Sequence, residues 1–203
     1  MGAKSLILKD RLRGANHRLA LPTGWQGTVM GDRTLRELVY GKGAHVDPVA
    51  CVEDLSADMA ARRVPGYPHS IWQIVLHMNY WMEYELRKIA GKNPHNPDHA
   101  LESWPSHVEP ADASQWAEAS SQWQDARQHF VDDLSQLAAL ADSDSVTLDR
   151  LVGDFDIAKN PRQTSVRATL WQITAHNSYH AGQIALLRRQ AGAWPPERGG
   201  DTW

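Results

Sequence analysis

Apolar residues recur every three or four positions in three long segments of the chain, a spacing that places them on one face of a helix. The first segment opens at Ser70, and its apolar positions are Ile71, Val75, Met78, Met82, Leu86 and Ile89. The second begins near Asp112 and carries Trp116, Trp123, Phe130, Leu134 and Leu137. The third runs from near Ser165 to just before Gly192, and its apolar face comprises Val166, Leu170, Ile173, Ile184 and Leu187, with His176 or Asn177 and His180 between them. The pattern predicts three amphipathic helices.

The first of these helices has clear boundary signals. Ser70 and Gln73 have the spacing of a capping box, in which each side chain satisfies a free backbone N–H group. Gly91, followed by Pro94, is typical of a helix end. A fourth helix is predicted upstream, from Asp47 to Leu55 or on to Arg63, because an aspartate can cap free N–H groups and the proline after it suits the first helical position.

Two long linkers separate the last three helices, at residues 92–112 and 142–163. Alternating apolar and polar positions, which would predict strands, are absent from the chain outside the helical segments. Four amphipathic helices with long connections indicate an all-α four-helix bundle with one or two long crossover loops. We expect the linkers to cross the ends of the bundle or to cover its open side.

The N-terminal segment, residues 1–29, shows no sustained period, whereas a cleaner pattern opens at Met30. Two interpretations are open: an upstream extension that arises from a mis-chosen start codon, or a genuine arm that packs on the domain. We expect residues 1–29 to lie outside the core fold and residues 30–203 to form the bundle.

Length, charge and cysteine content exclude several classes of protein. A chain of 203 residues indicates one domain, with or without an arm. Its formal net charge of −3 argues against a general nucleic-acid binder. No apolar run approaches the roughly 20 residues that span a membrane, and the early stretch Leu-Ile-Leu is too short for a secretory signal. The single cysteine, Cys51, is interpreted as a packed small residue, and its isolation fits a reducing cytoplasm.

Three histidines are the strongest candidates for chemistry. His176 and His180 lie four residues apart on the apolar face of the last helix, where imidazoles without partners would be costly to bury. His95 and His99 have the same spacing, but they lie among prolines where no helix is expected. His77 lies in the middle of its own helix and would meet the pair if the two helices pack antiparallel. A hydrogen-bonded core histidine is the alternative for each ring. Together the three would bind one divalent ion, Zn²⁺ or Ni²⁺, and leave coordination positions open.

At these residues the chain resembles the DinB-like superfamily, which includes YfiT-type metal-dependent hydrolases. The resemblance rests on residues 68–81, 165–192 and 193–203, and it covers residues 31–203. It implies an up-down-down-up bundle, often dimeric, with His77, His176 and His180 as the metal triad and a pocket beside the ion. The run Gly182-Gln183-Ile184 also matches. Some relatives are thiol-dependent transferases that use bacillithiol or mycothiol.

Several other residues are possible members of this site. Trp81, Tyr84 and Gln183 are candidates for the pocket, although each has a structural alternative. The tryptophans at 72, 81, 116, 123 and 171 are expected in the core or the pocket wall. The helical angles of Glu83 and Glu85 do not favour the apolar face. The last helix has no acidic residue beside its histidines, which argues against a peptidase of the HExxH type. His69, His107 and His129 are interpreted as surface or capping residues.

Two functions remain open. The first is a metal-dependent enzyme acting on a small molecule, either a thiol-dependent S-transferase that uses a low-molecular-weight thiol or a hydrolase, with a role in stress or detoxification. The second is a non-catalytic protein in which the ion staples two helices together. We expect a cytoplasmic protein that forms a homodimer and binds neither nucleic acid nor membrane.

Overall fold

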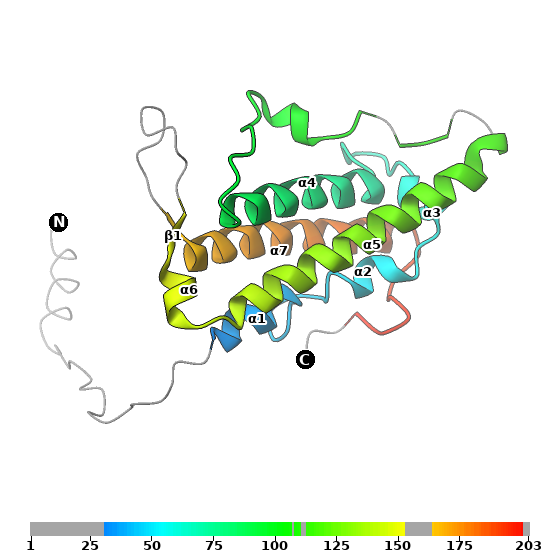
Figure 1. Ribbon diagram of the computed structural model, residues 1–203. Helices are drawn as coiled ribbons and strands as arrows, with labels where there is room; N and C mark the ends of the chain where they lie inside the picture. The colour runs from blue at the N-terminus through cyan, green and yellow to red at the C-terminus, as the bar shows by residue number, and fades with distance from the viewer. Residues whose placement is uncertain (1–30, 107, 111–112, 153–163, 201–203) are drawn as a thin grey trace, which may run out of the picture.

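Four main helices pack around one core in the computed structural model, which describes residues 31–106, 108–110, 113–152 and 164–200 (Figure 1). They are α1 (Arg33–Val39), α4 (Ile71–Ile89), α5 (Trp116–Ala141) and α7 (Val166–Gln190). Helix α4 contacts α5 on one side and α7 on the other, and α1 closes the ring by contacting the same two helices. The predicted all-α four-helix bundle is therefore confirmed.

The chain direction follows the up-down-down-up order that the resemblance implied. In Figure 1, the segment from α1 to α3 runs in the same direction as α7, whereas α4 and α5 run in the opposite direction. Helices α4 and α7 are consequently antiparallel neighbours. Helices α4 and α5 are parallel although they are consecutive, so the connection between them must travel back along the whole bundle.

The N-terminal side of the bundle differs from the predicted single helix. Two short helices, α2 (Ala50–Glu53) and α3 (Ala57–Ala61), replace it, and α1 precedes them. Asp47 accepts a hydrogen bond from the Val49 amide as a cap would, but the chain leaves the helix at Asp54 and restarts at Ser56, whose side chain accepts from the Met59 amide. The second cap breaks the predicted helix in two.

The boundaries of the long helices agree well with their sequence signals. Ser70 and Gln73 form the predicted capping box at the start of α4. Gly91 follows its end with a φ angle of 76°, a left-handed conformation that glycine adopts without strain. Ser165 caps α7 by accepting from the Ala168 amide. Helix α5 begins at Trp116 after the short 3₁₀ helix η2 (Ala113–Gln115), and the predicted start at Asp112 lies outside the described residues.

The core consists of the predicted apolar faces. The side chains that are almost fully buried include Met78, Met82, Phe130, Leu134, Leu137, Leu170 and Ile184. Cys51 is also fully buried, and burial raises the pKa of its thiol to about 12, as befits a packed residue and not a nucleophile. Trp171 is a correction: it lies on the outer face of α7 and is 39% exposed, because it is rotated by about 100° from the buried Leu170.

The two linkers contain short elements. The first carries the 3₁₀ helix η1 (Ala100–Ser103). The second carries α6 (Ser145–Asp149) and a two-stranded antiparallel ladder of β1 (Leu151–Val152) and β2 (Thr164–Ser165). The sequence predicted no strand, because strands of two residues are too short to show an alternating pattern. None of the helices in the described part of the chain is long and apolar enough to cross a membrane.

Candidate metal centre

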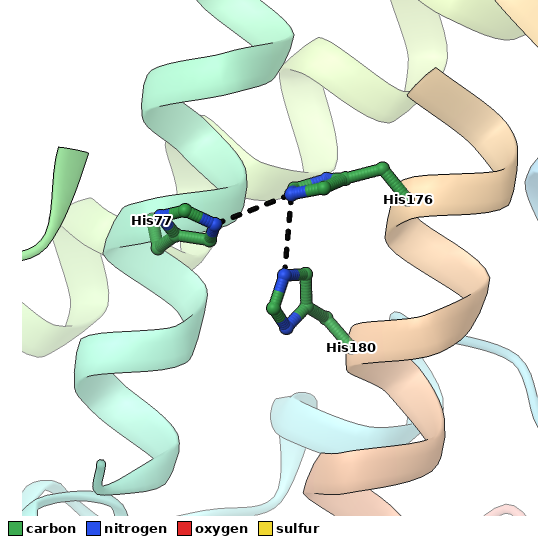
Figure 2. Close-up of side chains that lie close together, drawn as sticks. All are labelled: His77, His176 and His180. Carbon is green, nitrogen blue, oxygen red and sulfur yellow. Dashed lines mark hydrogen bonds between the residues drawn. The ribbon is translucent and has the colours of Figure 1, made fainter. Parts of the chain in front are cut away.

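Three imidazole rings converge between α4 and α7 (Figure 2). His77 comes from the middle of α4, while His176 and His180 project from successive turns of α7. The His176 Nε2 atom lies 3.2 Å from the Nε2 atom of His77 and 3.2 Å from that of His180. One nitrogen from each ring can be chosen so that all three lie within 4.8 Å of one another. The antiparallel packing of two distant helices thus brings the predicted residues together.

Each of the three rings uses its other nitrogen, Nδ1, to contact an oxygen atom. His77 Nδ1 lies 3.1 Å from the backbone carbonyl of Ser103, and His180 Nδ1 lies 2.6 Å from Oε1 of Gln183. His176 Nδ1 lies 3.3 Å from Oδ1 of Asn177. Because a carbonyl oxygen only accepts hydrogen bonds, these contacts favour a proton on each Nδ1. The lone pairs on the three Nε2 atoms then face one another.

Burial keeps these rings neutral. His77 and His180 are 6% and 5% exposed, and His176 is half-buried. Desolvation is the main cause that lowers the pKa of His77 and of His180 to about 4, and it also lowers the pKa of His176. Only the neutral form of imidazole can coordinate a metal, so the pocket holds all three rings in the form that binds an ion.

The arrangement fits a divalent transition-metal ion. Nitrogens bound at 2.0–2.1 Å in a tetrahedral site are roughly 3.3 Å apart, close to the two Nε2 separations of 3.2 Å. Imidazole donors suit zinc, copper, iron and nickel. Unprotonated nitrogens cannot hydrogen-bond to each other, so a cation would remove the repulsion between their lone pairs. No cysteine or acidic residue among the described residues joins the three histidines as a fourth ligand.

A comparison with known families places this cluster in context. The sequence model of the DinB family matches residues 30–199, which include all three histidines. The chain belongs to the DinB family. Searches of curated proteins and of solved structures gave no match. The resemblance drawn from the helical motifs is therefore confirmed at the level of the family.

The first crossover completes the wall of the site in this DinB-family chain. Its Ser103 carbonyl fixes the His77 ring, and the neighbouring Trp104 stacks on the same ring with centroids 3.7 Å apart and planes 7° from parallel. His69 stacks on the other face of Trp104 at 3.8 Å. His69 is thus part of the wall behind the site and not simply a surface residue. Sequence reasoning expected a covering linker but did not single out Ser103 or Trp104.

The predicted pocket residues have different surroundings. Trp81 lines a cavity of about 290 Å³ together with His176, and Tyr84 packs on Trp81 with ring centroids 5.4 Å apart but is not among the residues that line the cavity. Gln183 contacts His180 and donates from Nε2 to the Tyr179 hydroxyl.

The sequence interpretation of Glu85 needs correction. Glu85 is 7% exposed and lines the same cavity, although its helical angle was judged unfavourable. The reason is that α4 is covered by α7 as well as by α5, so more of its circumference is buried than one apolar stripe suggests. His129 is exposed, as expected, and its Nε2 atom lies 3.2 Å from Asp133. His107 lies outside the described residues.

Proposed function

We propose that this protein is a metal-dependent enzyme that binds one divalent ion through the Nε2 atoms of His77, His176 and His180. The observation that carries the proposal is the direction of the three rings. All three turn Nε2 toward a common centre, and all three use Nδ1 on a separate oxygen partner. Second partners of this kind fix the tautomer of metal-binding histidines and increase their basicity.

The donor set determines the chemistry that the ion would supply. Three neutral imidazoles leave the charge of the ion uncompensated, so a bound Zn²⁺ or Ni²⁺ would lower the pKa of a coordinated water or small thiol. The residues of the chain have the remaining tasks. Ser103 and Gln183 orient two of the rings, and Trp104 covers His77 and excludes water from that side.

The cavity beside His176 supports a small-molecule substrate. It measures about 290 Å³, at the lower end of the roughly 300–1,000 Å³ typical of ligand pockets. Trp81 and Ile173 give it apolar walls, while His176 links it directly to the triad. A small reactant in this cavity could therefore reach the centre without unfolding the helices.

The proposed reaction is the activation of a small nucleophile, either a low-molecular-weight thiol or water. The resemblance to thiol-dependent transferases supports the first and the resemblance to hydrolases supports the second. The two differ in a simple assay. A thiol transferase is inactive with an electrophile alone and saturates as thiol is added, whereas a hydrolase turns over simple esters or amides in buffer.

Metal analysis is the first test of this proposal. Protein purified without added metal should contain close to one zinc or nickel ion per chain, as measured by inductively coupled plasma mass spectrometry. The His180→Ala variant should contain almost none. His129→Ala provides the matched control, because this histidine is exposed on α5 and lies outside the triad. Equal metal content in the two variants would contradict ligation by the triad.

Activity then separates catalysis from a purely structural ion. The metal-loaded protein should show either the thiol-dependent or the buffer-only activity, and removal of the ion with a chelator should abolish it. Return of the ion should restore the rate. A protein that binds the ion and unfolds more easily without it, but is inactive toward both substrate classes, would instead be one in which the metal joins α4 to α7.

A further inference from the structure

The cavity beside the histidine triad has one acidic wall residue, Glu85. The residues that line the cavity are Trp81, Glu85, Gln172, Ile173 and His176. Glu85 is only 7% exposed, which is unusual for an ionisable side chain on a helix surface. A buried carboxylate in a largely apolar wall is costly unless charged or polar partners compensate it. The Glu85 carboxylate is therefore expected to have a charged or polar partner nearby.

Lys88 provides part of this compensation. Its Nζ atom lies 2.6 Å from Oε2 of Glu85, and the lysine itself is largely covered and lies over the Tyr84 ring. The Oε2 atom is buried and, apart from this ion pair, accepts no hydrogen bond from the described residues. A carboxylate has two oxygens and about four lone-pair sites, so one ammonium group does not exhaust its capacity to accept hydrogen bonds. Lys88 thus holds the carboxylate in place while leaving it able to bind a second donor.

Glu85 and His176, one member of the triad, both line the cavity, and we take the side of His176 as its histidine end. Glu85 follows His77 by eight residues on α4, which corresponds to roughly 12 Å along the helix axis at 1.5 Å per residue. Trp81 lies midway between them on the same helix. His176, which lines the cavity, is next to His77 across the interface between α4 and α7. A small molecule that reaches from one end to the other would contact the histidine end and the carboxylate at once.

We propose that Glu85 selects small molecules that carry an ammonium or similar cationic group. The proposal rests on the proposed function, because the reacting end of that molecule would lie at the histidine end of the cavity. The cationic end would bind the Glu85 carboxylate, and the aromatic ring of Trp81 would add a favourable contact with the positive charge. An anionic analogue of the same shape would leave this carboxylate without a second partner, and a neutral alcohol would offer it only an uncharged O–H donor.

The test compares three probes of similar shape with the zinc-loaded protein: 2-phenylethylammonium, 2-phenylethanol and phenylacetate. Isothermal titration calorimetry should show that the ammonium compound binds about tenfold or more tightly than the alcohol. In the metal-free protein, where no ion can coordinate a carboxylate, phenylacetate should bind most weakly. Glu85→Gln should reduce the affinity for the ammonium compound to about that for the alcohol. Glu83→Gln is the matched control, since Glu83 is 51% exposed and pairs with Arg87 outside the cavity.

A second variant guards against a folding defect caused by unpaired Lys88. The double variant Glu85→Gln with Lys88→Met removes both charges and should also lose the preference for ammonium while keeping the helical circular dichroism of the wild type. The inference is overturned if the wild type binds the alcohol as tightly as the ammonium compound, or if Glu85→Gln retains the preference.

The same titrations on metal-free protein separate this inference from the proposed function. Preference for ammonium without any uptake of zinc would contradict the metal-dependent enzyme but leave the role of Glu85 intact. Uptake of one zinc ion without any preference for ammonium would contradict only the role of Glu85.

Discussion

Trp104 lies flat against His77, with the ring centroids 3.7 Å apart and the ring planes 7° from parallel. The tryptophan comes from the crossover between α4 and α5, and the carbonyl of the preceding residue, Ser103, contacts the same histidine. The orientation of one candidate ligand therefore depends on a segment that belongs to none of the four main helices.

Replacement of Trp104 by alanine should weaken metal binding on the order of tenfold, because His77 would lose both its cover and the support of its hydrogen-bond partner. Competition with a metal chelator measures this affinity. Trp171→Ala is a suitable control, since that side chain is 39% exposed on α7. Equal affinities in the two variants would show that the stacked ring does not support the site.

Gln183 should be needed for full metal affinity. Its Oε1 atom lies 2.6 Å from His180 Nδ1, so Gln183→Leu would remove the acceptor that fixes this ring. Loss of such a partner typically lowers metal affinity by about 10–100-fold. Gln183→Glu retains an acceptor and should preserve or strengthen binding. Chelator competition distinguishes the three proteins, and a Leu variant that binds as tightly as the wild type would refute this role.

Asp133 should make stability depend on pH. Burial is the main cause that raises its pKa to about 6, with Glu83 and Asp132 acting in the same direction and His129 opposing them. The folded protein therefore binds more protons than the unfolded chain between about pH 4 and 6. Asp133 therefore stabilises the folded protein fully below about pH 4, and this stabilisation is lost as pH rises through 6.

The variant Asp133→Asn tests whether the contribution of Asp133 to stability decreases as pH rises. The variant should be more stable than the wild type at pH 8, by about 1–2 kcal/mol, and the difference should shrink or reverse at pH 4. Urea denaturation at the two pH values measures it. Asp132→Asn, at the exposed neighbouring position, should show little such dependence. A difference that grows as pH falls would contradict the expected sign.

Arg188 should be critical for stability. It is 2% exposed, and its guanidinium donates to both carboxylate oxygens of Asp54 at 2.7 and 2.9 Å and to the Cys51 carbonyl at 2.8 Å. Arg188→Met removes this donor, so the Asp54 carboxylate keeps the Glu197 backbone amide as a partner but loses its charged one. The substitution should lower the free energy of unfolding by about 3–5 kcal/mol. Arg87→Met, at an exposed position, should change it by less than about 0.5 kcal/mol. Similar denaturation midpoints for the two variants would contradict the expected importance of Arg188 for stability.

Removal of residues 1–29 should leave the bundle intact. The family match begins at residue 30, and the described helices begin at Arg33. A chain that starts at Met30 should keep the helical circular dichroism, the metal content and, within a few degrees, the melting temperature of the full chain. Aggregation or loss of the ion would show that the segment belongs to the domain.

The sequence predicted best those features that depend on neighbours along one helix. The Ser70 cap, the ends of α7 and the common face of His176 and His180 all follow from local spacing, and all are present. The chain between residues 33 and 61 was harder to predict, because helices of four to seven residues contain too few turns to establish a period.

The parts of the site that were missed depend on contacts between distant segments. Ser103 and Trp104 meet His77 across 26 and 27 residues, and nothing in the linker sequence specifies that meeting. Glu85 was misjudged for a related reason: a helical wheel shows one apolar stripe, but it does not show how far a second neighbouring helix extends the buried surface.

The spacing of the triad along the chain has a consequence for biosynthesis. His77 and His176 are separated by 99 residues, so His77 leaves the ribosome long before its partners have been made. A half-finished chain has only one of the three rings and cannot retain an ion in competition with other cellular ligands. Domains fold largely as units, so the centre is complete only when α7 docks onto α4. If the proposed ion binds there, it would therefore be loaded after synthesis, as the last step of maturation.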